Sequence, residues 1–288
     1  MINRLCIIGV GLIGGSLALA LKKSGYCREV IGAGRSKERL EKALSLGVVD
    51  RIEMDYAKAV KQADMVLVAV PLGAMREVFE QIATALPANC IVTDAGSAKL
   101  CVIQHAEAAF GLKINQFVPG HPIAGTEQSG VEAAFDSLYQ CRRVILTPLE
   151  SNSNDAVKKV RAMWQAAGAE VDEMGPRHHD LILAGTSHLP HILAFSLVDC
   201  LNRLDDVDEI FKFAAGGFRD FTRIASSDPV MWRDICLHNR DAILAMMQRF
   251  QQEVDEVRNA IETEEGNKLL EIFARAKQAR DDFSMRSV

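Results

Sequence analysis

The sequence has no excess of basic residues. Its 33 Lys and Arg are outnumbered by 38 Asp and Glu, which gives a formal net charge of −5 at pH 7. Proteins that bind nucleic acid generally present a surplus of positive charge to the phosphate backbone. The composition therefore argues against a nucleic-acid partner, although a local basic pocket for an acidic metabolite remains compatible with it.

Paired cysteines are also missing. The seven cysteines form no C-x-x-C motif, and an odd, unpaired set fits neither a disulfide framework nor a zinc ribbon. Reduced thiols in a cytoplasmic protein are the expected state. Four histidines, His178, His179, His188 and His191, fall close together, but the H-E-x-x-H motif of helical zinc sites is absent. We interpret them as a polar rim around a cleft between domains and expect no metal.

Long hydrophobic runs are few. The run from residue 5 to residue 21 follows Arg4 and so shares two features with a signal peptide. Four glycines interrupt it, and no small-residue cleavage site with a polar mature start follows. No other stretch reaches the roughly 18 apolar residues that a membrane span needs. We therefore expect no membrane association, and the glycines need another explanation.

The length and the order of the expected elements indicate two domains. A chain of 288 residues is expected to form two domains at about 100–200 residues each. As far as residue 174, short apolar runs alternate with helical stretches, and runs such as 65–70 are typical of strands covered on both faces. After Pro176 the pattern predicts helices alone.

These elements define the expected fold class. The predicted strands cover residues 5–8, 30–31, 65–70, 90–93, 116–118, 144–146 and 170–174. The predicted helices after Pro176 cover residues 180–204, 208–214, 229–261 and 266–279, with a frayed tail at 281–288. The prediction is an α/β fold: a Rossmann-type, doubly wound, mostly parallel sheet in residues 1–174, followed by an all-helical C-terminal domain in residues 175–288.

A glycine-rich turn explains the interrupted run. Gly9, Gly11 and Gly14 match G-x-G-x-x-G directly after a predicted strand and at the start of a helix, the context in which this motif is informative. Gly9 would form the tight turn, Gly11 would admit a pyrophosphate, and Gly14 would let helix and strand pack closely. Leu12 and Ile13 lie in the same loop, where backbone N–H groups favour an anion. The alternative is a glycine-rich turn that binds no ligand.

The end of the second strand bears on the choice of cofactor. An NAD site usually carries an acidic residue here, which bonds the ribose hydroxyls and repels a 2′-phosphate. This sequence has Gly34, Arg35 and Ser36 instead, which leave space and offer phosphate-binding groups. We expect NADP or NAD, with a preference for NADP, unless Arg35 is only a solvated surface charge. Val70 and Pro71, at the end of the third strand, are further expected cofactor contacts.

A serine and a histidine follow two later strands. Ser97 lies in D-A-G-S-A-K after the strand at 90–93, and His121 begins H-P-I-A-G-T-E after the strand at 116–118. Both are expected in the crevice at the carboxyl ends of the strands, where they would suit a general base and an orienting hydroxyl. A Ser-His-Asp hydrolase is the competing idea, but Ser97 does not lie in G-x-S-x-G. The chemistry of these residues alone favours a structural role for His121.

Glycines, arginines and aromatic residues gather in residues 216–223. Arg219 and Arg223 lie beside flexible glycine backbone, and Trp232 follows the capping pair Asp228-Pro229. Arginines in such a setting suit bidentate binding of carboxylates. An ordinary helix end with surface arginines is the alternative.

Taken together, these segments resemble the prephenate/arogenate (cyclohexadienyl) dehydrogenase family of tyrosine biosynthesis. The matching pieces span about residues 5 to 240 in the family's order. They are G-V-G-L-I-G-G-S, D-A-G-S-A-K, H-P-I-A-G-T-E, S-H-L-P-H and G-F-R-D-F-T-R-I-A-S-S-D-P-V-M-W-R-D-I. The histidine segment and the long arginine segment are specific to the family, whereas the glycine loop is not.

The resemblance implies a reaction and a set of site residues. The reaction is oxidative decarboxylation of prephenate to 4-hydroxyphenylpyruvate, or of arogenate to tyrosine, with hydride transfer to NAD(P). His121 would accept the proton of the ring hydroxyl as a neutral imidazole, Ser97 would orient His121 and the substrate, and Arg223 would bind a substrate carboxylate. Further residues would line the same pocket: Thr126, Glu127, His188, His191, Arg219 and Trp232.

The resemblance also implies a homodimer formed through the helical domain. We expect no fused chorismate mutase and no regulatory domain of the ACT type, so any feedback inhibition is expected at the active site. Two alternatives remain. One is a dehydrogenase of the 3-hydroxyacid or 6-phosphogluconate type, which depends on a catalytic lysine in the helical domain. The other is a dinucleotide-sensing protein without activity. The choice between prephenate and arogenate stays open.

Overall fold

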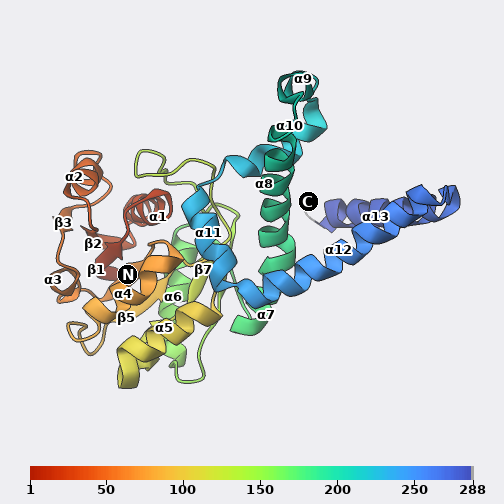
Figure 1. The fold of residues 1–288 in the computed structure, drawn as a ribbon. Helices are drawn as coiled ribbons and strands as arrows, with labels where there is room; N and C mark the ends of the chain where they lie inside the picture. The colour runs from red at the N-terminus through yellow and green to blue at the C-terminus, as the bar shows by residue number, and fades with distance from the viewer. Residues whose placement is uncertain (287–288) are drawn as a thin grey trace. The chain divides into compact units, whose positions relative to one another are not determined.

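The computed structural model describes residues 1–286. The chain forms two compact units, residues 1–240 and the residues from 241 onward. The first unit holds every strand together with the helices as far as His238, and the second holds the last helix pair. Figure 1 gives the order of the elements, from red at the N-terminus to blue at the C-terminus.

A six-stranded sheet organises the first unit. Its strand order is β3-β2-β1-β4-β5-β6, and every neighbouring pair is parallel. The strands are β1 (Ile2–Ile8), β2 (Cys27–Ala33), β3 (Arg51–Glu53), β4 (Met65–Val68), β5 (Ile91–Asp94) and β6 (Phe117–Val118). The connecting helices are α1 (Leu12–Lys23), α2 (Lys37–Ser45), α3 (Tyr56–Val60), α4 (Leu72–Ile82) and α5 (Leu100–Phe110), and a 3₁₀ turn (Gly111–Gln116) precedes β6. This is the doubly wound Rossmann topology that the sequence predicted.

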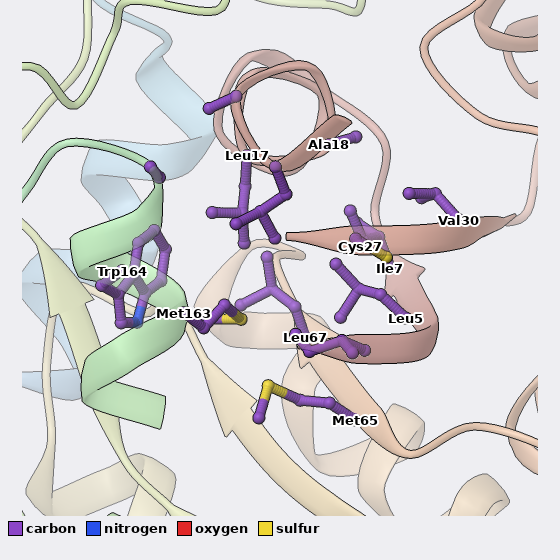
Figure 2. Close-up of a cluster of buried hydrophobic side chains, with 14 of the residues drawn as sticks. Leu5, Ile7, Leu17, Ala18, Cys27, Val30, Met65, Leu67, Met163 and Trp164 are labelled. Atoms are coloured by element: carbon purple, nitrogen blue, oxygen red, sulfur yellow. The ribbon is translucent and has the colours of Figure 1, made fainter. Parts of the chain in front are cut away.

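Both faces of the sheet are buried because helices cover both. Leu5 and Ile7 of β1 point to the face covered by α1 and by α6 (Asn154–Ala166), where they share one buried cluster with Leu17 and Trp164 (Figure 2). Successive side chains on a strand alternate in direction, so Cys6 and Ile8, both fully buried, point to the other face. This double coverage explains the continuous apolar runs in the sequence.

Two predicted strands lie outside this sheet. The segments 144–146 and 170–174 belong to a separate three-stranded sheet, β7-β8-β9, formed by β7 (Gly120–Pro122), β8 (Arg143–Leu146) and β9 (Glu170–Glu173). β7 runs antiparallel to β8, and β8 pairs in parallel with β9. The expectation of one continuous sheet is therefore wrong for these segments, since an apolar run indicates a strand but not the partner that it pairs with.

The helical part of the first unit begins where Pro176 occupies the first turn of a helix, a position that tolerates proline. It contains α7 (Pro176–Leu183), a π-helical turn (Ala184–His188), α8 (Leu189–Asn202), α9 (Val207–Lys212), α10 (Gly216–Thr222), a 3₁₀ turn (Arg223–Ser226) and α11 (Pro229–His238). The single helix predicted at 229–261 is wrong. The chain breaks at Asn239, whose buried side chain bonds to Asp180 and His188.

The stretch Pro176–Asn202 has the length and composition of a membrane-crossing helix, with a mean hydropathy of 1.5. The prediction that no stretch after residue 21 could span a membrane is therefore wrong by length and composition. Its polar residues His179, Asp180 and His188 are buried in the first unit, where they contact residues of other elements. This stretch therefore makes buried polar contacts with other elements of the first unit.

The second unit is a pair of helices, α12 (Arg240–Glu262) and α13 (Gly266–Arg286). A short turn joins them, with Glu264 in the left-handed region at φ 55°, and an ion pair links Lys268 to Glu256 at 3.3 Å. The predicted frayed tail is wrong for residues 281–286, which continue α13. Residues 287 and 288 lie outside the described residues.

Candidate active site

The glycine turn after β1 has the geometry of a phosphate-binding loop. Gly9 adopts φ 98°, and a Cβ atom there would lie 2.5 Å from the carbonyl oxygen of Ala69. A Cβ atom on Gly14 would lie 2.5 Å from the carbonyl oxygen of Gly9, whereas Gly11, the N-cap of α1, faces open space. No side chain caps α1, so its first N–H groups are available to an anion. Val70 lies directly beside the turn, near Gly9.

The end of β2 carries no carboxylate. After Ala33, the last residue of β2, come Gly34, an exposed Arg35 and Ser36. The hydroxyl oxygen of Ser36 caps α2 by accepting from the N–H of Arg39 at 3.3 Å, which leaves its own proton free to donate. Within the part of the chain that the structure describes, Arg35 makes no ion pair.

His121 lies at the centre of a buried chain of hydrogen bonds. It is the middle residue of β7, and its Nδ1 lies 2.8 Å from Nε2 of His179 on α7. Nδ1 of His179 in turn lies 2.8 Å from a carboxylate oxygen of Asp180. His179 and Asp180 are almost fully buried, and His121 is 8% exposed. Nε2 of His121 has no hydrogen-bond partner among residues 1–286.

A buried ion pair supports this region from the carboxyl end of β5. The ammonium of Lys99 lies 2.5 Å from the carboxylate of Asp94 and 2.6 Å from the carbonyl oxygen of Gly120, the residue before His121. Asp94 also accepts from the N–H of Gly120 at 3.0 Å and from that of Gly96 at 2.8 Å. Both charged side chains have zero exposure. These bonds fix the backbone that carries His121 to the edge of the main sheet.

Two carboxylates from the helical part dock on the starts of sheet helices. Asp180 accepts from the N–H groups of Lys99 and Leu100 at 2.7 and 3.0 Å, at the beginning of α5. Asp234 on α11 accepts from the N–H of Gly73 at 3.1 Å, at the beginning of α4. The first N–H groups of a helix favour negative charge. Both contacts therefore hold the helical part against the carboxyl edge of the sheet.

Aromatic rings form a second group of predicted residues. The ring of His191 stacks on Trp232 with centroids 3.8 Å apart, and His188 meets the same indole edge-on at 6.1 Å. The indole N–H of Trp232 is buried and has no partner within the described residues. The rim interpretation is wrong for His179 and His188, because both are interior side chains. No metal-binding group of three or more His, Cys, Asp or Glu exists in residues 1–286.

The remaining predicted residues are more exposed. Arg223, in the 3₁₀ turn after α10, forms an ion pair with Glu127, so the structure brings these two together. Thr126 and Arg219 are exposed. Ser97 is half-buried, and its hydroxyl makes no hydrogen bond among the described residues. Nδ1 of His121 bonds to His179 instead.

The electrostatics keep the buried imidazoles neutral. Burial lowers the pKa of His121 well below its ordinary value, and His179, Lys99 and His188 lower it further. Burial also lowers the pKa of His179, although Asp180 opposes that shift, and burial lowers the pKa of His188 to about 4. At neutral pH, His121 is therefore an unprotonated base.

Four residues of this site carried no sequence prediction, and a fifth, His179, was predicted only as part of a polar rim. They are Asp94, Lys99, His179, Asp180 and Asn239. The first two stand at the ends of the D-A-G-S-A-K segment, and the next two form a His-Asp pair just after Pro176. These positions carried a signal in their residue types, but their burial and mutual contact depend on the tertiary fold.

A six-stranded parallel sheet of this order, with an uncapped glycine turn after β1, is the architecture of Rossmann-type nucleotide-binding enzymes. Comparison with known families narrows the class. The model for the nucleotide-binding domain of prephenate dehydrogenase matches residues 17–173. The model for the dimerization domain of the same enzyme matches residues 175–275. The chain belongs to the prephenate dehydrogenase family.

Individual relatives agree with this membership. Prephenate dehydrogenase of Bacillus subtilis (strain 168) is 39% identical over 288 residues, which covers 99% of this chain and 77% of the relative. Cyclohexadienyl dehydrogenase of Zymomonas mobilis is 37% identical over 282 residues, 96% of this chain and 95% of the relative. The crystal structure of Aquifex aeolicus prephenate dehydrogenase with hydroxyphenyl propionate and NAD+ superposes with a TM-score of 0.92 at 37% identity, covering 98% of this chain and 99% of that one.

Proposed function

We propose that this protein oxidatively decarboxylates prephenate or arogenate and passes the hydride to a nicotinamide dinucleotide. The observation that carries the proposal is the state of His121, which is buried, neutral and free of partners at Nε2. It lies beside the carboxyl end of β5, the edge at which Rossmann enzymes bind their ligands. The names of the relatives supply the substrate class.

The chemistry asks little of the protein beyond placement and one base. A nicotinamide dinucleotide held at the glycine turn would supply the acceptor for the hydride of the ring carbon that carries the hydroxyl. As the ring becomes aromatic, the bond to the ring carboxylate breaks and carbon dioxide leaves. As the hydride leaves the carbon, the hydroxyl becomes more acidic, and Nε2 of His121 accepts its proton. The same proton then returns to the phenol oxygen of the product. No net proton is released.

Steady-state kinetics test the proposal. We expect turnover of prephenate or arogenate, with NAD or NADP, at a catalytic efficiency far above that for any simple hydroxyacid. Measuring all four combinations identifies the preferred pair. Reduction of the cofactor by a 3-hydroxyacid, with neither cyclohexadienyl compound oxidised, would contradict the proposal.

We further propose that Arg223 binds a substrate carboxylate. The substrate carboxylate would take the place of Glu127, the present ion-pair partner of Arg223. Arg223→Ala should raise KM by about tenfold or more, since hydrogen bonds to charged groups contribute roughly 1.5–3 kcal/mol. The turnover number should fall less, because this contact is present in both ground and transition states. Arg203→Ala, which breaks an exposed ion pair with Asp199 in the same helical part, is the control and should leave KM nearly unchanged. An unchanged KM in Arg223→Ala would exclude it as a ligand.

The choice of cofactor is a finer proposal. Gly34 leaves space where a carboxylate would repel a 2′-phosphate, and the exposed Arg35 has no competing ion pair in the described residues. The hydroxyl proton of Ser36 is likewise free to bond to a 2′-phosphate. These features support a preference for NADP, although the Aquifex aeolicus relative was crystallised with NAD+.

Removing the guanidinium tests this preference. Arg35→Ala should weaken the binding of NADP by about tenfold and that of NAD by less than about twofold. A solvent-exposed hydrogen bond to phosphate contributes the lower part of the roughly 1.5–3 kcal/mol that hydrogen bonds to charged groups provide. The measurement is the ratio of kcat/KM for the two cofactors in both proteins. A wild-type enzyme that prefers NAD by tenfold or more would overturn the proposal.

We also propose that the protein is a twofold-symmetric homodimer through its helical region. The matched dimerization-domain model covers residues 175–275. Apolar side chains stay exposed along these helices, spaced three or four residues apart in α12, as in Leu244, Met247, Phe250 and Val254. Such surfaces usually mark an interface. Sedimentation equilibrium at micromolar concentration should give twice the chain mass of 31.6 kDa, and a mass of one chain would contradict a dimer.

A further inference from the structure

His179 is a buried histidine that the proposed chemistry does not itself use. It lies fully buried between two polar groups, with Nε2 2.8 Å from His121 and Nδ1 2.8 Å from Asp180. Its ring meets that of His121 edge-on, with centroids 5.0 Å apart. A buried imidazole with both nitrogens bonded has a fixed orientation and a fixed tautomer.

The donors and acceptors along this chain follow from Asp180. Burial alone would raise the pKa of Asp180, but the bonds from His179 and from the N–H groups of Leu100 and Lys99 lower it overall. Ionised Asp180 can only accept, so Nδ1 of His179 must donate to it. Since His179 is neutral, its Nε2 carries a lone pair and accepts from Nδ1–H of His121. The remaining nitrogen of His121, Nε2, is then left without a proton.

We propose that His179, backed by Asp180, is the positioning residue that holds His121 in the tautomer with a free Nε2. The inference rests on the proposed role of His121 as the base. The alternative tautomer would place a proton on Nε2 and leave the base unable to accept one. Selecting the correct tautomer by a carboxylate-anchored partner can be worth up to about 10⁴-fold in rate.

Nearby charges favour positioning over proton transport. The ammonium of Lys99 disfavours a proton on either His121 or His179. Two other titratable groups face the pair: Asp94 raises the pKa of His179, and His188 lowers the pKa of His121. The reaction returns its proton to the phenol oxygen, so nothing has to leave through His179. Its contribution is therefore the lone pair that it offers to Nδ1–H of His121.

Nitrogen-15 NMR of the imidazoles tests the tautomer directly, without reference to turnover. The chain has seven histidines, and the resonances that disappear in His121→Asn identify those of His121. At neutral pH we expect a protonated Nδ1 and an unprotonated Nε2 in wild-type His121. A protonated Nε2 would overturn the proposal.

A matched pair of variants tests the effect on catalysis. His179→Gln keeps a carbonyl oxygen that accepts from His121 and an amide that donates to Asp180, whereas His179→Leu removes both. Second-sphere partners that orient a functional histidine are typically worth about 10–100-fold. We expect His179→Leu to lower kcat by that factor with KM changed less than about threefold, and His179→Gln to recover at least about tenfold of the loss. Melting temperature and cofactor binding check that each variant folds.

The outcomes separate this inference from the proposed function. Equal losses in the two variants, or wild-type kcat in His179→Leu, would overturn the positioning role even if His121 is essential. If His121→Asn keeps wild-type turnover, the proposed base fails instead, whatever tautomer the NMR spectra show. If His179→Leu does not fold, the wild-type spectra and His179→Gln still decide the question.

Discussion

Replacing His121 by asparagine should lower kcat by about 10²–10⁴-fold, the range that general acid–base catalysis contributes. The amide can occupy the position of Nδ1 and still donate to His179, so the buried bond survives while the reactive nitrogen is lost. Cofactor affinity should be unchanged, because the glycine turn is a separate structure. Steady-state turnover together with cofactor titration by fluorescence measures both quantities.

The same variant should change the pH profile. In the wild-type enzyme kcat/KM should rise with pH as the imidazolium of His121 loses its proton, and then stay level. Burial, His179, Lys99 and His188 lower the pKa of His121, so the rise should lie below the ordinary histidine value of about 6.5. In His121→Asn this limb should disappear. Near-normal turnover, or an unchanged acidic limb, would end the assignment of His121 as the base.

Replacing Lys99 by methionine should lower the free energy of unfolding by about 3–5 kcal/mol, the usual effect of removing one partner from a buried ion pair. The substitution keeps the apolar bulk but leaves the carboxylate of Asp94, with zero exposure, without its cation. It also removes the donor to the carbonyl of Gly120, next to His121. Chemical denaturation measures the loss.

An exposed ion pair supplies the control for this prediction. Arg76 and Glu80 are paired one turn apart on the surface of α4, with 67% and 52% of their side chains exposed. Arg76→Ala should change stability by less than about 0.5 kcal/mol. The double change Lys99→Met with Asp94→Asn should recover part of the loss, because no uncompensated charge remains. If Lys99→Met costs less than about 1 kcal/mol, then the buried pair does not hold this region together.

The elements that sequence reasoning predicted well are those with a local cause. The strand Ile2–Ile8, of which the sequence predicts residues 5–8, the glycine turn and α1 follow from an apolar run, three glycines and a helical pattern, all within about two dozen residues. Ser36 stands at the N-cap of α2, a position that serine favours. The order of such elements was enough to predict the parallel sheet.

The site residues that were missed depend on long-range contacts. Lys99 is a charged residue at the start of a helix, a position that is usually solvated, and only the fold buries it against Asp94 and Gly120. His179 reaches His121 across 58 residues of sequence, a distance that no periodicity reports. No glycine or proline marks the break at Asn239. The side chain of Asn239 bonds to Asp180 and His188, and these contacts form only in the folded chain.

The central claim is that this chain couples hydride transfer to loss of the ring carboxylate. The most direct measurement is the stoichiometry of a single turnover with excess enzyme and cofactor, using prephenate and, separately, arogenate. For at least one of them we predict one reduced nicotinamide, one carbon dioxide and one aromatic product per substrate consumed, all appearing at the same rate and all slowed by about 10²–10⁴-fold in His121→Asn. Bound cofactor that stays oxidised with both substrates, or reduced nicotinamide formed without carbon dioxide, would contradict the account.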